Sequence, residues 1–278
     1  MQSARIMQKA GIIACHGGIM LNRYVLCTSV FATFIALLAL SMPVHADLVE
    51  TLAKVKPAIV GVGSVLPTRN PARIFVGTGF VVGDGLTVVT NAHVLPALLD
   101  QAQKERLVVY SGSALKPVTH EAHVVARDVE HDIAILRLEG APLPALQLGD
   151  SNQVREGATM AFTGLPLGMV LGFNPATHRG IVAAITPYVS PAFSSQQLDA
   201  KFIRRLARPF DVFQLDAIAY PGNSGSPMYD PDTGIVYGVL NSVFIKESKE
   251  NLLKQPSGIT FVIPGNYIRD LLVKPRAP

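Results

Sequence analysis

Short stretches of apolar or alternating residues recur along the chain from residue 58 onward, separated by clusters of Gly, Pro, Asn and Asp. Runs of four to eight residues that are rich in β-branched side chains and bounded by such clusters are typical of β-strands joined by turns. The pattern therefore predicts an all-β chain. Strands are expected at 58–64, 79–82, 87–90, 106–110, 122–126, 133–138, 159–163, 181–185, 212–215, 235–240 and 259–263.

Apolar residues at helical spacing are confined to three short patches. They lie at Val49–Val55, at Leu95–Lys104 and at Asn266–Val273, the last directly after Pro264. A period near 3.6 over so few residues predicts short helices on a β-rich framework. The turn-rich segment Gly140–Pro144 is the expected boundary between two halves of the strand pattern.

Residues 1–46 have the composition of a secretory leader. They contain three basic residues and no acidic residue, an apolar stretch at Tyr24–Leu40, and Val44-His45-Ala46 before Asp47. A basic region, a hydrophobic core and a small-residue cleavage site predict a signal peptide at 1–46 and export to the periplasm. An uncleaved membrane anchor is the alternative, because the apolar stretch approaches the length that spans a bilayer. Met20 is an alternative start.

The positions of the cysteines and the net charge limit which metal sites and binding partners can be expected. Both cysteines, Cys15 and Cys27, lie in the leader, so the exported chain is expected to have no disulfide and no thiolate metal site. His120 and His123 form the nearest histidine pair, without a carboxylate spaced to complete a metal site, and are interpreted as surface residues. Without the leader, 21 basic residues stand against 20 acidic residues, so bulk charge gives no reason to expect nucleic-acid binding.

One turn combines two glycines with a serine, at Gly222-Asn223-Ser224-Gly225. Glycines allow the backbone to turn sharply, so that the serine hydroxyl can project and the amides of Gly222 and Ser224 can converge on one point. A glycine–serine turn by itself is more often only a turn. Its chemical interpretation therefore depends on residues elsewhere in the chain.

A histidine and an aspartate upstream could supply the base and the acid that a nucleophilic serine needs. His93 follows the apolar run 86–89, and Asp132 directly precedes the run 133–138. A serine hydroxyl needs a base to take its proton, histidine has a suitable pKa, and an aspartate fixes the imidazole tautomer. The chain order His, Asp, Ser is that of a chymotrypsin-type triad. Asp128 is the rival acid, and Asp132 is preferred because it abuts the strand that would hold it.

Ten motifs across the chain resemble trypsin-like serine proteases of the Deg/HtrA type. They are LVETLAKVKPAIVGV (48–62), GTGFVV (77–82), TNAHV (90–94), HDIAILRL (131–138), LGDS (148–151), GLPLG (164–168), GIVAAI (180–185), DAIAYPGNSGSP (216–227), GIVYGVLNS (234–242) and GITFVIP (258–264). The resemblance implies two six-stranded antiparallel β-barrels with the active site in the crevice between them. It implies one protease domain at 47–278, with the barrels at about 56–140 and 150–264 and a C-terminal helix at 265–274.

The resemblance also implies roles for individual residues. His93 would be the general base, Asp132 would orient it, and Ser224 would be the nucleophile. Gly222 would join Ser224 in the oxyanion hole. The implied activity is that of a serine endopeptidase that acts on polypeptides through an acyl-enzyme and uses no cofactor or metal.

Two residues bear on cleavage preference. In trypsin-like enzymes the floor of the specificity pocket lies six residues before the nucleophile, which is Ile218 in this sequence. Leu240 stands where glutamyl endopeptidases, which share the GNSGSP variant with Ser226, hold a histidine. The two apolar side chains predict cleavage after small or medium apolar residues rather than after Glu, Lys or Arg.

The chain also departs from the family pattern. It ends at Pro278, fourteen residues past Pro264, which leaves no room for the PDZ module that usually follows the protease. An aromatic-bearing N-terminal arm, which builds trimers in that family, is not evident after Asp47, so the oligomeric state stays open. A protease domain without PDZ control is therefore expected.

Residues 196–208, QQLDAKFIRRLAR, are predicted to form a helix with four basic residues on one side and apolar residues on the other. It is either a helical insert packed on the second barrel or a regulatory or membrane-surface element. By resemblance, it falls in a loop that senses activating signals in Deg/HtrA proteases.

Two classes of function follow. The first is an exported endopeptidase that degrades unfolded or damaged envelope proteins, or processes one partner protein with the same chemistry. The second is a non-catalytic, chaperone-like or scaffold protein on a protease fold.

Overall fold

The computed structural model describes residues 47–96, 99–100, 102–113, 116–167, 173–188, 209–241 and 258–273. The predicted signal peptide at 1–46 and the predicted basic helix at 196–208 lie outside these residues. Within the described ranges, no helix has both the length and the apolar character needed to cross a membrane.

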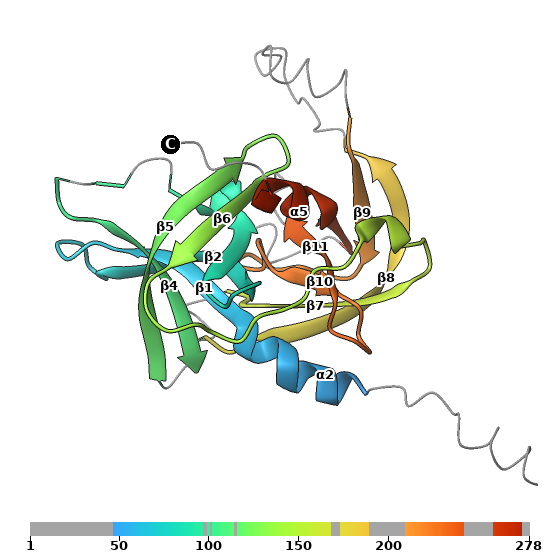
Figure 1. Ribbon diagram of the computed structural model, residues 1–278, viewed down its shortest axis with the longest axis horizontal. Helices are drawn as coiled ribbons and strands as arrows, with labels where there is room; N and C mark the ends of the chain where they lie inside the picture. Colours follow the sequence, from blue (N-terminus) through green and yellow to red (C-terminus); the bar gives the residue numbers. More distant parts are fainter. Residues whose placement is uncertain are drawn as a thin grey trace, which may run out of the picture. The chain divides into compact units, whose positions relative to one another are not determined.

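The first barrel contains six antiparallel strands in the order β1-β2-β3-β6-β5-β4 (Figure 1). Strand β1 pairs with both β2 and β4, which closes the barrel. The strands are β1 (Ile59–Val65), β2 (Arg73–Val82), β3 (Thr87–Asn91), β4 (Arg106–Ser113), β5 (Lys116–Asp128) and β6 (Ile133–Leu138).

The second barrel repeats this arrangement in the order β10-β11-β12-β9-β8-β7, closed by the pairing of β10 with β7. Its strands are β7 (Thr159–Gly164), β8 (Ala176–Pro187), β9 (Asp211–Asp216), β10 (Pro227–Tyr229), β11 (Val236–Asn241) and β12 (Ile259–Pro264). The predicted all-β fold of two six-stranded antiparallel barrels is confirmed. Strand β10 was not predicted, because three residues are too few to form a recognisable pattern.

Each barrel encloses an apolar core. In the first barrel, Phe80, Val88, Ile135 and Leu136 are almost fully buried, and in the second, Phe162 and Leu215 are. All six lie on the predicted strand runs. The neighbours Ile135 and Leu136 are both buried because β6 is covered on both faces, on which successive side chains lie in turn. Tyr229, Val239 and Ile263 of the second barrel pack with the core of the first, which joins the two barrels.

The two short α-helices tie the ends of the described chain to the barrels. Helix α2 (Leu48–Val55) is capped by Asp47, whose side chain accepts from Val49 N–H. The Thr51 hydroxyl donates to Asp232 O at 3.0 Å. Helix α5 (Asn266–Val273) follows β12. Asn266 accepts from Ser151 N–H at 3.1 Å and donates to Asp150 Oδ1 at 2.8 Å. Both helices match the predicted patches.

The helix predicted at Leu95–Lys104 is wrong for the described residues of that segment. Only a 3₁₀ turn, Ala92–Val94, follows β3. Pro96 lacks an N–H, and Lys104 has a φ of +61° that no helix accommodates. Asp100 instead organises a loop by accepting from Gln103 N–H at 3.0 Å.

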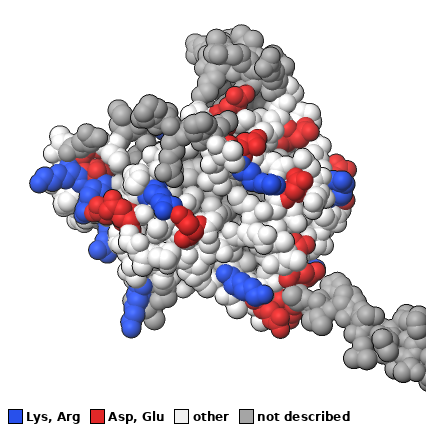
Figure 2. All heavy atoms as spheres, in the orientation of Figure 1, with Lys and Arg blue, Asp and Glu red and all other residues white. Residues whose placement is uncertain are grey.

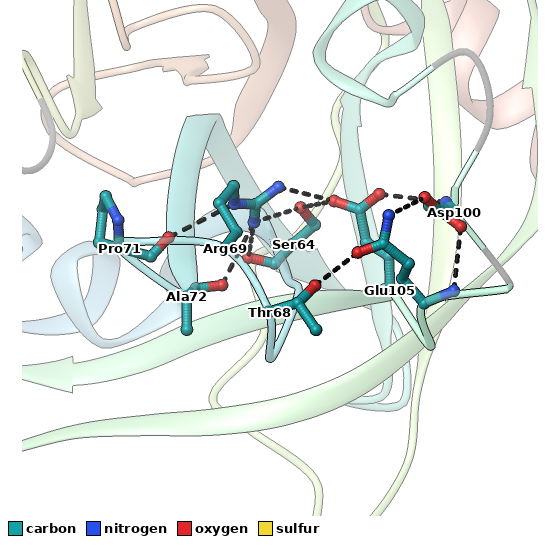
Figure 3. A network of polar contacts seen from close by, with 8 residues as sticks. Ser64, Thr68, Arg69, Pro71, Ala72, Asp100 and Glu105 are labelled. Atoms are coloured by element: carbon teal, nitrogen blue, oxygen red, sulfur yellow. Dashed lines mark hydrogen bonds and ion pairs between the residues drawn. The ribbon is translucent and has the colours of Figure 1, made fainter.

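A polar network joins that loop to the β1–β2 connection, as Figure 3 shows. Arg69 Nη1 and the Ser64 hydroxyl donate to the same Glu105 oxygen, at 2.9 and 2.6 Å. Arg69 also donates to the carbonyls of Ser64 and Ala72, at 3.3 and 3.2 Å. This network fixes two loops of the first barrel against each other.

On the face shown in Figure 2, basic and acidic side chains of described residues are interspersed among larger uncharged areas. This distribution agrees with the near balance of charges from Asp47 onward.

Candidate active site

His93 lies in the 3₁₀ turn Ala92–Val94, directly after β3. Strand β3 ends at Asn91, the last of its residues that pairs with β6, opposite Ile133. The chain turns directly after this pair. The His93 side chain keeps 29% of its surface exposed, so a substrate can reach it. A strand end of this kind gives the histidine a rigid support beside open solvent.

Asp132 occupies the turn before β6 and contacts His93 twice. Its Oδ1 accepts from the His93 backbone N–H at 2.8 Å, and its Oδ2 lies 2.6 Å from His93 Nδ1. The carbonyl of Asp132 accepts from Ala92 N–H at 3.1 Å and from the Asn91 side chain at 3.0 Å. Both predicted residues of the base–acid pair are therefore brought together, with the imidazole held by the nitrogen that faces the aspartate.

Two further side chains support the pair. Asn241, buried at the end of β11, donates from Nδ2 to Asp132 Oδ2 at 2.6 Å. Arg127 donates from Nη2 to Ala92 O at 2.8 Å and so supports the turn that carries His93. Sequence reasoning missed both residues. A polar residue at the end of an apolar run is only a weak indication of a functional role for Asn241. Nothing in the sequence around Arg127 indicates that it supports the histidine turn.

The rival acid, Asp128, is engaged elsewhere. Its Oδ2 lies 2.7 Å from Nδ1 of His131, whose ring stacks on Tyr267 with centroids 3.9 Å apart. Burial raises the pKa of Asp128, but hydrogen bonds from the side chain and backbone of His131 outweigh it, so the net pKa is below its ordinary value. Asp128 therefore belongs to a second His–Asp contact that joins α5 to the first barrel.

Ser224 lies in the turn before β10 and is 6% exposed. Its carbonyl accepts from Thr78 N–H of β2 at 2.8 Å, which fastens the turn of the second barrel to the first. Gly77 stands between this turn and the histidine turn: a Cβ there would lie 2.8 Å from Val94 Cγ2 and 3.1 Å from Ser224 O. The predicted serine and histidine thus come from segments that both pack on Gly77.

Gly222 adopts a φ of +98°, which favours glycine. The preceding carbonyl, Pro221 O, accepts from Leu167 N–H at 2.7 Å. Because C=O and N–H point to opposite sides of a trans peptide, the Gly222 N–H points away from Leu167. That N–H has no hydrogen-bond partner among the described residues. An amide N–H without a partner can donate a hydrogen bond to an anionic oxygen.

Ser226, the residue that replaces a glycine of the family pattern, is fully buried behind the turn. Its N–H donates to Asn223 O at 3.0 Å, and its carbonyl accepts from Leu240 N–H at 2.8 Å. A Cβ on Gly164 would lie only 1.9 Å from Ser226 Oγ, so the serine side chain fills space that glycine at position 164 leaves free.

The two residues predicted to form the specificity pocket differ in exposure. Leu240 is fully buried in the core of the second barrel, while Ile218 follows β9 and is 37% exposed. The Leu240 carbonyl accepts from Gly225 N–H at 3.0 Å. Leu240 therefore adjoins, through its backbone, the turn at 221–226 that carries Ser224, which is called the serine turn below. The pocket assignment stays a prediction.

A cavity of about 270 Å³ adjoins the base–acid pair. Tyr188, Phe210, Val129 and Ile263 make its wall largely apolar, and His93 and Asp132 also line it. Phe210 packs edge-on against His131, with centroids 4.7 Å apart. Among the described residues, no cluster of His, Cys, Asp or Glu could hold a metal ion.

Comparison with known proteins finds one matching family model. The model of the trypsin-like peptidase domain matches residues 77–239, which include His93, Asp132 and Ser224.

Serine protease HTRA2, mitochondrial, from Bos taurus is 35% identical over 238 residues, which are 82% of this chain and 42% of that protein. A probable periplasmic serine endoprotease, DegP-like, from Halomonas elongata is 28% identical and matches 73% of this chain and 35% of its own length. The chain thus spans about two fifths of the length of these curated relatives.

Among solved structures, the HtrA-type protease AlgW with tripeptide superposes with a TM-score of 0.57 at 23% identity. The match covers 81% of this chain and 62% of that one. At this identity, the likeness establishes a common fold.

Proposed function

This chain belongs to the trypsin-like serine proteases of the Deg/HtrA type, and from that premise we propose that it is an endopeptidase with His93, Asp132 and Ser224 as its catalytic residues. The observation that carries the proposal is the contact of His93 with Asp132, at 2.6 Å, together with the 2.6 Å bond from Asn241 to the same carboxylate. A carboxylate held this way can fix the imidazole tautomer and stabilise the imidazolium.

The reaction begins with proton transfer from the Ser224 hydroxyl to Nε2 of His93, while Nδ1–H stays bonded to Asp132. The serine oxygen forms a bond to the scissile carbonyl carbon, and the carbonyl electron pair moves onto its oxygen. His93 then gives the proton to the leaving amine as the C–N bond breaks. Water repeats the sequence on the acyl-enzyme and releases the new carboxyl end.

The Gly222 amide is the proposed oxyanion donor, with the Ser224 amide as its companion. Two supporting observations are the anchored Pro221 carbonyl and the Gly222 N–H, which has no hydrogen-bond partner in the described part of the chain. Donors that are already oriented before the charge develops contribute most to such catalysis.

We infer that the substrates are polypeptides with small or medium apolar residues before the scissile bond. Ile218 and Leu240 supply the apolar lining, without an acid that would pair with Lys or Arg. Such residues are accessible mainly in unfolded segments, which favours damaged or unfolded envelope proteins. The DegP-like relative described as periplasmic supports the location. The comparisons give no support to the scaffold alternative.

The direct test is hydrolysis of unfolded casein by the purified protein and by Ser224→Ala. Loss of a triad nucleophile lowers the rate by several orders of magnitude, on the order of 10⁶. Cleavage by the native protein alone establishes both the activity and the nucleophile. Equal cleavage by the variant would reject Ser224 as the nucleophile.

Cleavage preference is tested with a chromogenic peptide library on the same preparation. We expect hydrolysis after Val, Ala, Leu or Met. Hydrolysis mainly after Arg, Lys or Glu would overturn the assignment of Ile218 and Leu240.

A further inference from the structure

Thr78 lies in β2 of the first barrel and is fully buried. Its N–H donates to Ser224 O at 2.8 Å, and its hydroxyl donates to Gly222 O at 2.6 Å. The hydroxyl oxygen also accepts from Leu165 N–H at 3.0 Å, and the Thr78 carbonyl accepts from the Thr90 hydroxyl at 2.7 Å. One residue of the first barrel therefore contacts both the serine turn and the turn that follows β7.

The bond from Leu165 determines where the Thr78 hydroxyl directs its proton. An amide N–H can only donate, and a hydroxyl has a single proton. The Leu165 N–H can only donate and the Gly222 carbonyl can only accept, so the single hydroxyl proton points to the carbonyl of Gly222. The β-branched side chain also restricts rotation about χ1, so the hydroxyl is held in this direction.

The preceding carbonyl, that of Pro221, is also held by the turn that follows β7. Pro221 O accepts from Leu167 N–H at 2.7 Å, and Leu167 adopts a φ of +54°. Two successive carbonyls, those of Pro221 and Gly222, are thus anchored to residues 165–167 and to Thr78. The N–H between them, on Gly222, is the proposed oxyanion donor. It shares a peptide plane with the Pro221 carbonyl, which sets its direction, while the Gly222 carbonyl held by Thr78 fixes the next plane and so limits rotation at the Gly222 Cα.

Close backbone packing keeps Thr78 in register with the turn. A Cβ on Gly225, where φ is +89°, would lie 1.9 Å from Thr78 O. The serine turn therefore rests on the backbone of β2 itself. Movement of the turn away from Thr78 would break several contacts at once.

We propose that Thr78 is a positioning residue of the oxyanion hole, whose hydroxyl holds the Gly222 carbonyl and links it to the turn 165–167. It acts through the backbone of Gly222 and has no contact with substrate in this role. The proposal rests on the endopeptidase function proposed above.

Three variants separate positioning from stability. Thr78→Val removes the hydroxyl with little change of shape, and Thr78→Ser keeps the hydroxyl without the β-branch. Thr51→Val is the matched control, because Thr51 is also almost fully buried and its hydroxyl donates to a backbone carbonyl, Asp232 O, far from the serine turn in sequence. Melting temperature is measured for all three.

In peptide hydrolysis we expect Thr78→Val to lower kcat by about 10- to 100-fold, less than the 10² to 10³ for outright loss of an oxyanion donor. KM should change by less than about threefold, since ground-state binding does not use this donor. Thr78→Ser should recover kcat to within about fivefold, and Thr51→Val should leave it unchanged. Labelling of Ser224 by a fluorophosphonate, which forms a tetrahedral adduct, should slow in parallel with kcat.

A second measurement does not depend on activity. In a Ser224→Ala background, hydrogen–deuterium exchange is followed for peptides that cover 164–167 and 219–226. Added Thr78→Val should accelerate exchange in both peptides, whereas added Thr78→Ser should change it little. Both turns are followed because the hydroxyl joins them.

Unchanged kcat in Thr78→Val would overturn the proposal, as would a loss seen in KM alone or unchanged exchange in the two peptides. A fall in kcat no larger than that of Thr51→Val at equal loss of melting temperature would do the same. If the native protein neither hydrolyses peptide nor reacts with the fluorophosphonate, the proposed function fails, and the exchange comparison still decides the role of Thr78.

Discussion

At the scale of single residues, Asp132 combines backbone strain with many contacts. Its φ of +53° lies in the left-handed region, which costs roughly 1–2 kcal/mol for a residue with a side chain, and Asp tolerates it better than most. Bonds from Ala92, Asn91, His93 and Asn241 offset this cost. Strain that is sustained by so many partners is typical of catalytic positions.

One matched pair of substitutions distinguishes the roles of the two acids, Asp132 and Asp128. Asp132→Asn keeps the shape but favours the wrong imidazole tautomer, so we expect kcat to fall by about 10⁴. Asp128→Asn should leave kcat within about threefold, because Asp128 contacts His131 instead. Steady-state kinetics on one peptide measures both. A larger loss in Asp128→Asn would reverse the assignment.

A second pair of variants isolates the close approach at the serine turn. Gly83 and Gly225 both have positive φ, +62° and +89°, but a Cβ on Gly83 meets nothing within 4 Å, whereas one on Gly225 lies 1.9 Å from Thr78 O. We expect Gly83→Ala to cost about 1–2 kcal/mol of unfolding free energy. Gly225→Ala should cost about 3 kcal/mol or more, because the steric overlap adds to the backbone term.

Urea denaturation measures the unfolding free energy of both glycine variants. Equal losses would show that the serine turn can move away from β2, contrary to the packing described above.

At the scale of elements, the loops of the first barrel are held by Glu105. The hydroxyl of Ser64 and the N–H of Asp100 donate to it, which together with Arg69 lowers the pKa of Glu105 below its ordinary value. Its side chain is only 11% exposed. The charged form is therefore bound more favourably in the folded protein than in the unfolded chain.

Glu105→Gln should lower the unfolding free energy by about 1–2 kcal/mol at neutral pH, since charged hydrogen bonds are lost. Glu121→Gln is the matched control, because its ion pair with Arg106 is about half exposed and contributes little. The advantage of native Glu105 is present above its ordinary pKa and disappears as pH falls through the lowered folded value. Urea melts at pH 7 and pH 3 measure this, and an undiminished difference at pH 3 would contradict it.

At the scale of the whole molecule, two partly buried histidines are expected to make stability depend on pH near neutrality. Burial lowers the pKa of His120 and His178 below the ordinary 6.5. His178 stacks on Phe162 with centroids 4.8 Å apart, and its Nε2 is buried with no partner among the described residues. As pH falls through 6.5, the unfolded chain takes up protons that the folded chain does not, so stability is full above this pH and declines below it.

His178→Gln should therefore flatten part of the decline in unfolding free energy between pH 7 and pH 5. His123→Gln is the control, since the His123 side chain is exposed on β5. Denaturation curves at pH 5, 6 and 7 provide the measurement. An unchanged slope in His178→Gln would show that another group carries the dependence.

The amino-acid pattern alone was enough to place most of the strands and to nominate the residues proposed as catalytic. Strand β6 and helix α5 have the predicted bounds, because a short apolar run, a helical period and turn residues are local properties. The three residues proposed as a triad could be nominated because each lies in a short motif of its own. Strand β10 was not predicted because three residues form no recognisable pattern, and the helix expected at 95–104 is wrong for the described residues of that segment.

Which of these groups contact one another depends on the folded chain. Asp132 rather than Asp128 contacts His93 because β6 pairs with β3, which places residues 39 positions apart side by side. Asn241 reaches Asp132 across 109 positions, and Thr78 reaches Gly222 across 144, through the packing of one closed barrel on the other. Such contacts depend on barrel closure and on backbone approach at glycine, which are properties of the folded chain as a whole.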